Sequence, residues 1–505
     1  MKFNTKTQGT GTTTNHEGEK AYTLTPALEL YTAIASAGLG DKFYESESDA
    51  LTRLRGLIER NDAAFVARLA IYAREKMYLR SIPLVLTVEL AALHSGDDLI
   101  ARLVRRVVRR ADEITELLAY YSVANDRQGT KKLHRLSKQL QKGLASAFNR
   151  FDEYQFAKYD RDGAITLKDA LFLVHPKPKG DSQQVLFDKI VKDELEVPYT
   201  WEVELSWLGK LKFQSEAERK KAIRDKWTEL IASGRLGYMA LLRNLRNILV
   251  AGVDKATLDK VCGQLKDPGA VAASKQLPFR FLSAYRELTQ VKNGFTGKVL
   301  AALEQAVLHT TANIAGFDED TKVVIAADVS GSMQKAVSKG SKVQCFDIGL
   351  LLAMLMQNRC GNVITGMFGD TWKAISVPKT KILANVQEFH LREGEVGYST
   401  NGYLVIKDLW ENEQVVDKIL MFTDCQLWNS NGNAGYFTDL WQKYKQMAPD
   451  AKLYLFDLAG YGNTPLQING NDVFLIAGWS DKIFQVLQAI EEGGRALDKI
   501  NEIAL

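Results

Sequence analysis

The segment VVIAADVSGSMQ, residues 323–334, decides the fold class of the C-terminal part of this chain. Its first half is continuously apolar, as in a strand that is buried on both faces. It ends in Asp328, Ser330 and Ser332, which are separated by single residues. Gly331 lets the backbone turn tightly enough to bring the two hydroxyls to one side. Because ligands bind at the carboxyl ends of strands in open α/β sheets, we interpret this segment as a strand leading into a binding loop.

The residues after Phe317 repeat this alternation of strand and helix. A helical pattern, KVQCFDIGLLLAMLMQNR, follows at residues 342–359, and a long helical pattern closes the chain at residues 481–505. Between them lie apolar, strand-like runs at residues 361–369, 372–378, 415–425, 451–459 and 471–479. Alternating strands and helices predict a doubly wound α/β domain over residues 317–505.

The residues before this point have a different pattern. Apolar residues recur at i, i+3, i+4 and i+7 in a succession of segments separated by short breaks, for example residues 49–61, 63–75, 84–96, 99–122, 215–234, 238–252 and 277–291. Many amphipathic helices in succession predict stacked helical hairpins over residues 21–316. The polar residues 1–20 are expected to be flexible. The predicted fold class is therefore α plus α/β, a helical-repeat region followed by a doubly wound sheet.

Composition restricts the class of protein. Of the 505 residues, 46% are hydrophobic and 25% are charged, as in a globular protein. The four cysteines lie far apart and form no C-x-x-C motif, which argues against a disulfide framework and a structural zinc site. The N-terminus resembles no signal peptide, and no apolar run reaches 18 residues. We expect a cytoplasmic, monomeric protein with no membrane partner.

Two further oxygen-bearing residues follow the pattern of the opening segment. Asp424 comes directly after the apolar run KILMFT, and Thr400 lies in the loop GYSTNG. Carboxylate and hydroxyl oxygens suit a hard divalent cation. Asp and Ser after a strand also serve commonly as helix N-caps, so the D-x-S-x-S spacing alone is weak. Together the residues predict one Mg²⁺ site, with Mn²⁺ as the alternative, formed by Asp328, Ser330, Ser332, Thr400 and Asp424.

A local excess of positive charge points to a polyanion. Residues 101–150 contain twelve Lys or Arg against four Asp or Glu, in a chain whose net charge is +4. Lys131, Arg135, Lys138 and Lys142 follow helical spacing, with Lys132 beside them, whereas leucines at 133, 136, 140 and 144 form a different stripe. A second basic face comprises Arg102, Arg105, Arg106, Arg109 and Arg110. One such stripe alone is slightly better explained by a solvated helix face, but two without compensating acids favour phosphate binding.

His175, Lys177 and Lys179 form a third basic element, in the proline-stiffened turn VHPKPK. A single histidine is usually structural or merely exposed. Two lysines beside it on a stiff turn also suit contacts with a phosphate or a base. The residues alone leave these two readings equally open.

The loops of the α/β part resemble the metal-ion-dependent adhesion site of von Willebrand factor A domains. Asp328, Ser330 and Ser332 match the D-x-S-x-S motif of that family, Thr400 the threonine of its second loop and Asp424 the aspartate of its third. One position departs from the pattern, because Asn401 stands where the family commonly has an aspartate. The resemblance implies a Rossmann-like sheet whose ion accepts an acidic group from a partner.

The helical part resembles the TROVE module of the Ro ribonucleoprotein family. KYDRDGAITLKDALFLVHPKP, residues 158–178, carries the likeness, together with LRSIPLVL, MALLRNLRNI and PFRFLSAY. The resemblance implies a ring of HEAT-like helical pairs that binds Y RNAs and the ends of misfolded non-coding RNAs. It also adds Lys158 to the expected RNA contacts and strengthens the case for His175, Lys177 and Lys179.

The resulting hypothesis is an RNA-binding protein of bacterial Ro type, not an enzyme, that acts in RNA quality control or processing, with an exoribonuclease as a potential partner. No Ser-His-Asp or Cys-His set is evident among the six histidines. The alternative is a metal-dependent adhesion scaffold that binds an acidic protein partner. Metal-dependent phosphotransfer or hydrolysis ranks third, because the predicted site offers one metal and no apparent base.

Overall fold

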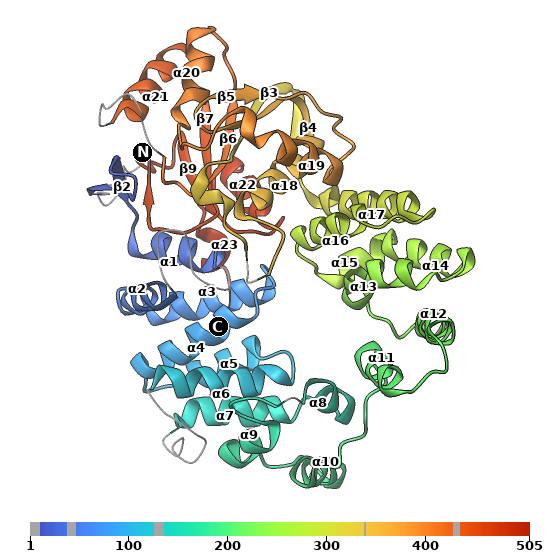
Figure 1. Ribbon diagram of the computed structural model, residues 1–505. Helices are drawn as coiled ribbons and strands as arrows, with labels where there is room; N and C mark the ends of the chain where they lie inside the picture. Colours follow the sequence, from blue (N-terminus) through green and yellow to red (C-terminus); the bar gives the residue numbers. More distant parts are fainter. Residues whose placement is uncertain (1–10, 38–46, 126–135, 161, 338–339, 428–434) are drawn as a thin grey trace. The chain divides into compact units, whose positions relative to one another are not determined.

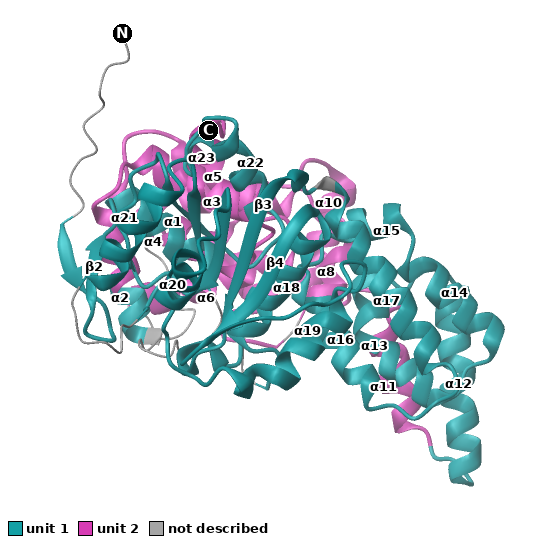
Figure 2. Ribbon diagram, turned by 90° about the horizontal axis from the view of Figure 1, so that it is seen from above, with its two compact units in different colours: residues 1–52, 212–498 teal, residues 53–211, 499–505 magenta. Residues whose placement is uncertain are grey.

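The computed structural model describes residues 11–37, 47–125, 136–160, 162–337, 340–427 and 435–505. Two compact units share the chain: residues 1–52 and 212–498 form unit 1, and residues 53–211 and 499–505 form unit 2 (Figure 2). The predicted boundary near residue 316 marks the change of secondary structure, whereas the compact units divide the chain elsewhere. None of the described helices combines the length and the apolar character needed to cross a membrane.

Unit 2 consists of helices (Figure 1). They are α3 (Ala63–Glu75), α4 (Ser81–Leu93), α5 (Leu99–Val107), α6 (Asp112–Ala124), α7 (Lys138–Phe148), α8 (Glu153–Tyr159), α9 (Leu167–Val174), α10 (Asp181–Lys192) and α11 (Trp201–Lys210), while α2 (Glu47–Glu59) joins the two units. Helices α5 and α7 approach closely at Gly143, where a Cβ would lie 2.5 Å from the Cβ of Val104. A larger side chain at Gly143 would force these helices apart.

Unit 1 contains helices before its sheet. They are α1 (Pro26–Ala35), α12 (Glu216–Ala232), α13 (Tyr238–Ala251), α14 (Lys255–Leu265), α15 (Pro268–Ser274), α16 (Phe279–Thr289) and α17 (Thr296–Thr310). Two contacts bind this helical segment to the α/β part. Arg286 of α16 forms a buried ion pair with Asp347, and the Glu304 carboxylate of α17 accepts backbone hydrogen bonds at residues 382–384, which begin another helix. A carboxylate at that position satisfies unpaired N–H groups and complements the helix dipole.

The α/β part is a six-stranded sheet in the order β5-β4-β3-β6-β7-β9. Its strands are β3 (Phe317–Asp328), β4 (Cys360–Phe368), β5 (Trp372–Ala374), β6 (Lys418–Thr423), β7 (Lys452–Asp457) and β9 (Val473–Ala477), all parallel except β5. Its helices are α18 (Cys345–Asn358), α19 (Leu383–Arg392), α20 (Tyr403–Glu411), α21 (Tyr436–Met447) and α22 (Ile483–Glu491). The predicted α plus α/β fold class is confirmed.

The strand order creates a switch point beside β3. The chain proceeds from β3 to β4 and β5 on one side and then returns to add β6, β7 and β9 on the other. The carboxyl ends of β3 and β6 therefore border the crevice in which such sheets bind ligands.

Four local features differ from the sequence-based expectations. The helical segment expected at residues 99–122 is two helices, α5 and α6, because residues 108–111 are not helical. The single closing helix is two helices, α22 and α23 (Asp498–Asn501), because Gly493 adopts a left-handed φ of 91° between them. The run at residues 372–378 is a strand only from Trp372 to Ala374. Residues 11–20, within the segment expected to be flexible, have a defined structure. There β1 (Thr12–Thr14) pairs with β2 (Lys20–Thr23), which in turn pairs with β8 (Asn463–Thr464).

Candidate functional site

The structure brings the five predicted metal-site residues to the switch-point edge of the sheet. Asp328 ends β3, Ser330 and Ser332 begin the loop after it, and Asp424 directly follows β6. Thr400 precedes α20, in a loop whose Tyr398 carbonyl accepts a hydrogen bond from the Gly331 N–H at 2.9 Å. All five side chains are buried. Three loops that are separate in sequence thus contribute to one buried polar cluster at the edge of the sheet.

Hydrogen bonds orient the first carboxylate. One Asp328 oxygen accepts from the Ser330 N–H at 2.9 Å, and the other accepts from the Thr423 hydroxyl at 2.6 Å. The Ser330 and Ser332 hydroxyls lie 3.2 Å apart. Sequence reasoning missed Thr423, although it stands next to Asp424 at the end of the same strand. The hydrogen bond from Thr423 to Asp328 depends on the register of β6 beside β3, which cannot be predicted from the sequence.

The second carboxylate has one oxygen that lacks a close hydrogen-bond partner. Asp424 Oδ1 accepts from the Gln426 N–H at 2.9 Å, whereas Asp424 Oδ2 has no hydrogen-bond partner within the described part of the chain. Thr400 Oγ1 is likewise buried and without a partner there. Buried polar oxygens that lack a partner are costly, and a bound cation would satisfy both of them. The residues present therefore fit a hard divalent cation.

Electrostatics support this interpretation. Burial raises the pKa of Asp328 and of Asp424, and the charge of Asp328 raises the pKa of Asp424 further. Two carboxyls in one buried site repel each other when both are ionised, and a cation removes that repulsion. Among the described residues no group of three or more His, Cys, Asp or Glu is arranged to hold a metal, so a site here depends on the hydroxyls.

Asn401, which departs from the adhesion-site pattern, is buried beside Thr400. Its amide nitrogen lies 3.5 Å from the Asp370 carbonyl, and Asp370 Oδ1 accepts from the Ser399 N–H at 3.0 Å. Asp370 also lies against Gly397, whose φ of 71° favours glycine. Sequence reasoning did not identify Asp370, which holds the threonine loop from another strand end.

The predicted RNA-binding residues fall in unit 2. Lys131, Lys132 and Arg135 lie outside the described residues. Lys138 and Lys142 are exposed on α7, while Leu140 and Leu144 are buried, as predicted. The expectation of one continuous helix from residue 131 is wrong, because residues 136–137 are not helical and α7 begins at Lys138. Ser137 precedes the helix without a capping hydrogen bond from its side chain.

The structure joins α7 to the histidine turn. The Gln141 amide donates to the carbonyls of Leu173 and Val174 at the end of α9, at 3.4 and 3.2 Å. His175 follows in a left-handed conformation, with φ of 49°, and is exposed. Asn149, just past α7, donates to the Lys177 carbonyl at 2.9 Å. The lysines of α7 and the turn at residues 175–179 therefore belong to one region of unit 2.

The remaining predicted lysines are also exposed. Lys177 and Lys179 lie in the turn, and the Lys179 ammonium donates to the Asn149 carbonyl at 3.2 Å. The Lys158 ammonium lies 5.6 Å from the ring centroids of both Tyr154 and Tyr159. Among the ion pairs between described residues, none involves Lys138, Lys142, Lys158, Lys177 or Lys179. Their charges are available to an outside anion.

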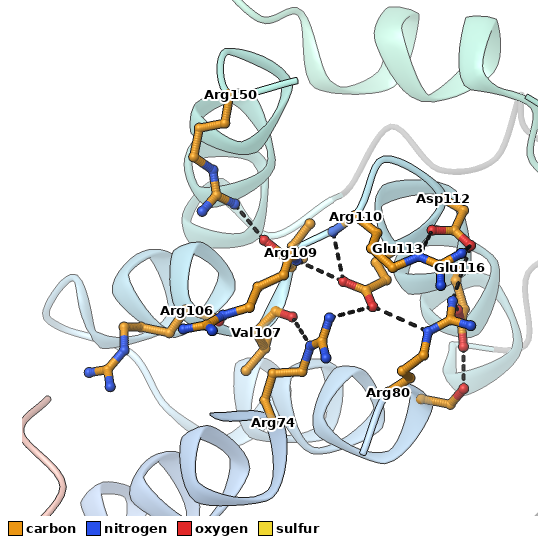
Figure 3. A network of polar contacts seen from close by, with 12 residues as sticks. Arg74, Arg80, Arg106, Val107, Arg109, Arg110, Asp112, Glu113, Glu116 and Arg150 are labelled. Carbon is orange, nitrogen blue, oxygen red and sulfur yellow. Dashed lines mark hydrogen bonds and ion pairs between the residues drawn. The ribbon is translucent and has the colours of Figure 1, made fainter. Parts of the chain in front are cut away.

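Four arginines of the second basic face are compensated, contrary to expectation, whereas Arg105 is exposed and forms no ion pair with a described residue. Glu75 of α3 pairs with Arg106 and Arg109, each at 2.7 Å, and Figure 3 shows Arg106, Arg109 and Arg110 among a wider network of Arg and acidic side chains. Arg102 pairs with Asp98 at 2.8 Å and Arg110 with Asp112 at 2.9 Å. The assumption that this stripe lacks compensating acids is wrong, because Glu75 comes from a helix 31 residues earlier.

Comparison with known proteins supports the assignment of both parts. A model described as the TROVE domain matches residues 41–210 and 192–314, and a model described as the Ro60 vWA domain matches residues 322–490. The chain belongs to the Ro family. The predicted likeness to TROVE and to a von Willebrand A domain is thereby confirmed.

Relatives of this Ro-family chain include far longer proteins. Telomerase protein component 1 of Rattus norvegicus is 24% identical over 295 residues, 45% of this chain and 11% of that protein. The Mus musculus protein of the same name is 36% identical over 99 residues, 20% of this chain and 3% of that protein. This chain thus spans a small part of either relative.

A solved structure shares the fold. The crystal structure of the Deinococcus radiodurans RO (RSR) protein superimposes with a TM-score of 0.58 and 18% identity, covering 93% of this chain and 100% of that one. At 18% sequence identity, this structural similarity establishes that the two chains share a fold.

Proposed function

We propose that this protein binds small structured RNAs of the Y RNA kind, and the single-stranded ends of misfolded non-coding RNAs, in RNA quality control or processing. Its membership of the Ro family supports the broader class, an RNA-binding ribonucleoprotein. The observation that carries the proposal is the exposed basic region of unit 2, formed by α7 and the turn at residues 175–179. An exoribonuclease that trims the bound RNA is the proposed protein partner.

The chemistry of this region suits phosphate and unpaired bases. Flexible lysines without intramolecular carboxylates neutralise phosphates and release counterions. His175 and the tyrosines around Lys158 supply ring faces on which unpaired bases stack. Arg106 and Arg109 instead pair with Glu75, Arg102 pairs with Asp98 and Arg110 with Asp112, so we assign these four arginines a structural role.

The first prediction concerns Lys138 and Lys142. The variant Lys138→Ala/Lys142→Ala is expected to bind RNA more weakly and to lower the slope of log affinity against log salt by about two, one for each phosphate that the variant no longer neutralises. Its melting temperature should not change, because both side chains are exposed. The measurement is a filter-binding salt titration with a stem–loop RNA that carries a single-stranded 3′ end.

The matched control removes the same charge from the α/β part. Lys381→Ala/Lys443→Ala replaces two exposed lysines there and should leave the slope unchanged. If both double variants lower the slope equally, binding reflects net charge and the α7 region is not the RNA site.

We also propose that Asp328, Ser330, Ser332, Thr400 and Asp424 hold one Mg²⁺, with Mn²⁺ as a substitute. The observation that favours this site is the pair of buried oxygens without partners, Thr400 Oγ1 and Asp424 Oδ2. When bound, the ion supplies positive charge that attracts an acidic group. The second candidate function of the protein is therefore metal-dependent binding of an acidic protein partner.

The second prediction tests whether Mg²⁺ binds at this site. Mg²⁺ at about 100 times its dissociation constant should stabilise the wild-type protein by about 2.7 kcal/mol, and Asp328→Ala should abolish that stabilisation. RNA binding should persist, because the basic region lies in unit 2. The measurement is thermal melting with Mg²⁺ and with chelator, alongside RNA binding.

Asp450→Ala, at an exposed turn of the same part, is the control and should retain the stabilisation by Mg²⁺. Loss of RNA binding by a folded Asp328→Ala protein would assign the ion to the RNA site instead.

A further inference from the structure

Arg150 joins the end of α7 to the end of α5. Its guanidinium donates to the carbonyls of Arg105 and Val108 at 2.8 and 2.6 Å. In Figure 3 the Arg150 side chain points toward the residues that follow Val107. Both carbonyls belong to the C-terminal end of α5, where the helix dipole favours a cation. Two hydrogen bonds therefore hold the exposed guanidinium in place, and its remaining N–H groups are available to another partner.

Arg105 lies beside this contact. Helices α5 and α7 cross at Val104 and Gly143, where a Cβ on Gly143 would also lie 3.1 Å from the Ala101 carbonyl. Because Arg105 follows Ala101 by one helical turn, it borders the face of α5 that meets α7. Its side chain is exposed and forms no ion pair with a described residue, unlike its neighbours on the second basic face.

Lys179 adds a third cation at the same place. Its ammonium donates to the carbonyl of Asn149, the residue before Arg150, at 3.2 Å. The Asn149 amide donates to the Lys177 carbonyl, so the turn at residues 175–179 rests against the end of α7. Two arginines and a lysine thus lie around the junction of α5, α7 and this turn. None of the three forms an ion pair within the described part of the chain.

The positive charges at this junction oppose one another. Burial lowers the pKa of Arg150, and the charges of Arg109 and Arg105 lower it further. The charge of Glu113 acts in the opposite direction, but that carboxylate is already bound to Arg74. Like charges held close together are unfavourable unless an anion lies among them.

Capping of α5 accounts for only part of this arrangement. An arginine near a helix C-terminus can bond the last carbonyls and complement the helix dipole. That role explains the position of Arg150, but it requires neither the exposed Arg105 nor the approach of Lys179. An anion accounts for all three cations. Phosphate suits them, because guanidinium groups bind its oxygens through paired hydrogen bonds and an ammonium adds a point charge.

We propose that Arg105, Arg150 and Lys179 form a subsite that binds one phosphate group of the RNA at the C-terminal end of α5. This inference rests on the proposed RNA binding. Lys179 belongs to the turn of the basic region already described, so the subsite extends that region from α7 to the end of α5.

The test is a filter-binding salt titration of the full-length protein with the stem–loop RNA that carries a single-stranded 3′ end. Arg105→Gln should lower the slope of log affinity against log salt by about one, because the variant no longer neutralises that phosphate. Its melting temperature should not change, because the side chain is exposed. Arg150→Gln should also lower the slope. The double variant should lose less affinity than the product of the two single losses, because both arginines bind the same phosphate.

Arg102→Gln is the matched control on the same helix. Arg102 has a side chain that is 41% exposed and carries the same charge, but it pairs with Asp98 at 2.8 Å. Its variant should keep the slope of the wild type.

The titration is repeated with the same RNA bearing either a 5′-hydroxyl or a 5′-monophosphate. An effect of Arg105→Gln on both RNAs assigns the subsite to an internal phosphodiester. An effect on the phosphorylated RNA alone assigns it to the RNA terminus.

The contradictory outcomes separate the subsite from the RNA binding on which it rests. Equal slopes of Arg105→Gln and Arg102→Gln, with a lower slope of Lys138→Ala/Lys142→Ala, overturn the subsite and leave RNA binding by the α7 region standing. Single losses that multiply in the double variant overturn a shared phosphate. A wild-type protein that does not bind the RNA overturns both proposals. If Arg150→Gln melts below the wild type, the comparison of Arg105→Gln with Arg102→Gln decides.

Discussion

Arg286→Met is expected to lower the free energy of unfolding by about 3–5 kcal/mol, because it removes the guanidinium that pairs with a buried carboxylate. Asp347 is 0% exposed and accepts two hydrogen bonds from the Arg286 guanidinium, at 2.5 and 2.6 Å. Burial would raise the pKa of Asp347, but hydrogen bonds from His390 and Arg286 and the charge of Arg286 together lower it. The measurement is urea denaturation of both proteins at neutral pH.

Two further variants make this result specific. Arg246→Met removes an arginine whose side chain is 59% exposed and pairs with Glu287, so its cost should stay below about 1 kcal/mol. Arg286→Met/Asp347→Leu removes both charges and should recover much of the stability that the single variant loses. If Arg286→Met is as stable as Arg246→Met, the ion pair does not hold α16 to α18.

Glu113→Gln is expected to destabilise unit 2 by about 3–5 kcal/mol, because every group that faces this carboxylate is a donor. One oxygen accepts from Arg74 at 2.7 Å and from Arg80 at 3.5 Å. The other accepts from the N–H groups of Arg109 and Arg110 at 2.7 and 3.0 Å (Figure 3). A glutamine NH₂ would face donors in either orientation and would leave Arg74, which is buried, without a countercharge.

The control is Glu116→Gln, one helical turn later. Glu116 accepts from the Ser81 hydroxyl and lies 3.7 Å from Arg80, with a side chain that is 36% exposed. Its cost should be less than about 1 kcal/mol. Thermal melting and urea denaturation compare the two variants, and equal stability of both would contradict a central role for Glu113.

The class of each part could be predicted from local patterns. Apolar runs that alternate with helical patterns predicted the sheet, and the segment at residues 323–334 identified the strand that ends at its switch point. Asp328, Ser330 and Ser332 are separated by single residues, so one tight turn is enough to gather them. The leucines of α7 and its exposed lysines also followed from periodicity.

The predictions of which basic residues are free to bind an anion succeeded less well, because a cation is neutralised by whichever acidic side chain lies near it in space. The arginine face appeared uncompensated within residues 101–150, yet its principal partner is Glu75 on α3. The lysines of α7 belong to the same stretch of sequence and have no such partner among the described residues. Sequence spacing does not distinguish these two cases.

The sequence by itself determined which oxygen-bearing residues follow the strands and which helix residues face solvent, since spacing along one strand or helix sets the direction of each side chain. Only the tertiary structure decided which distant groups meet. The register of β3 beside β6 places Thr423 against Asp328, and the packing of α16 on α18 buries Arg286 with Asp347. The N-terminal hairpin contacts Leu427, more than 400 residues away in sequence, through the Asn15 amide. The physical reason is that packing of the apolar faces fixes these distances, and no local pattern encodes the partner.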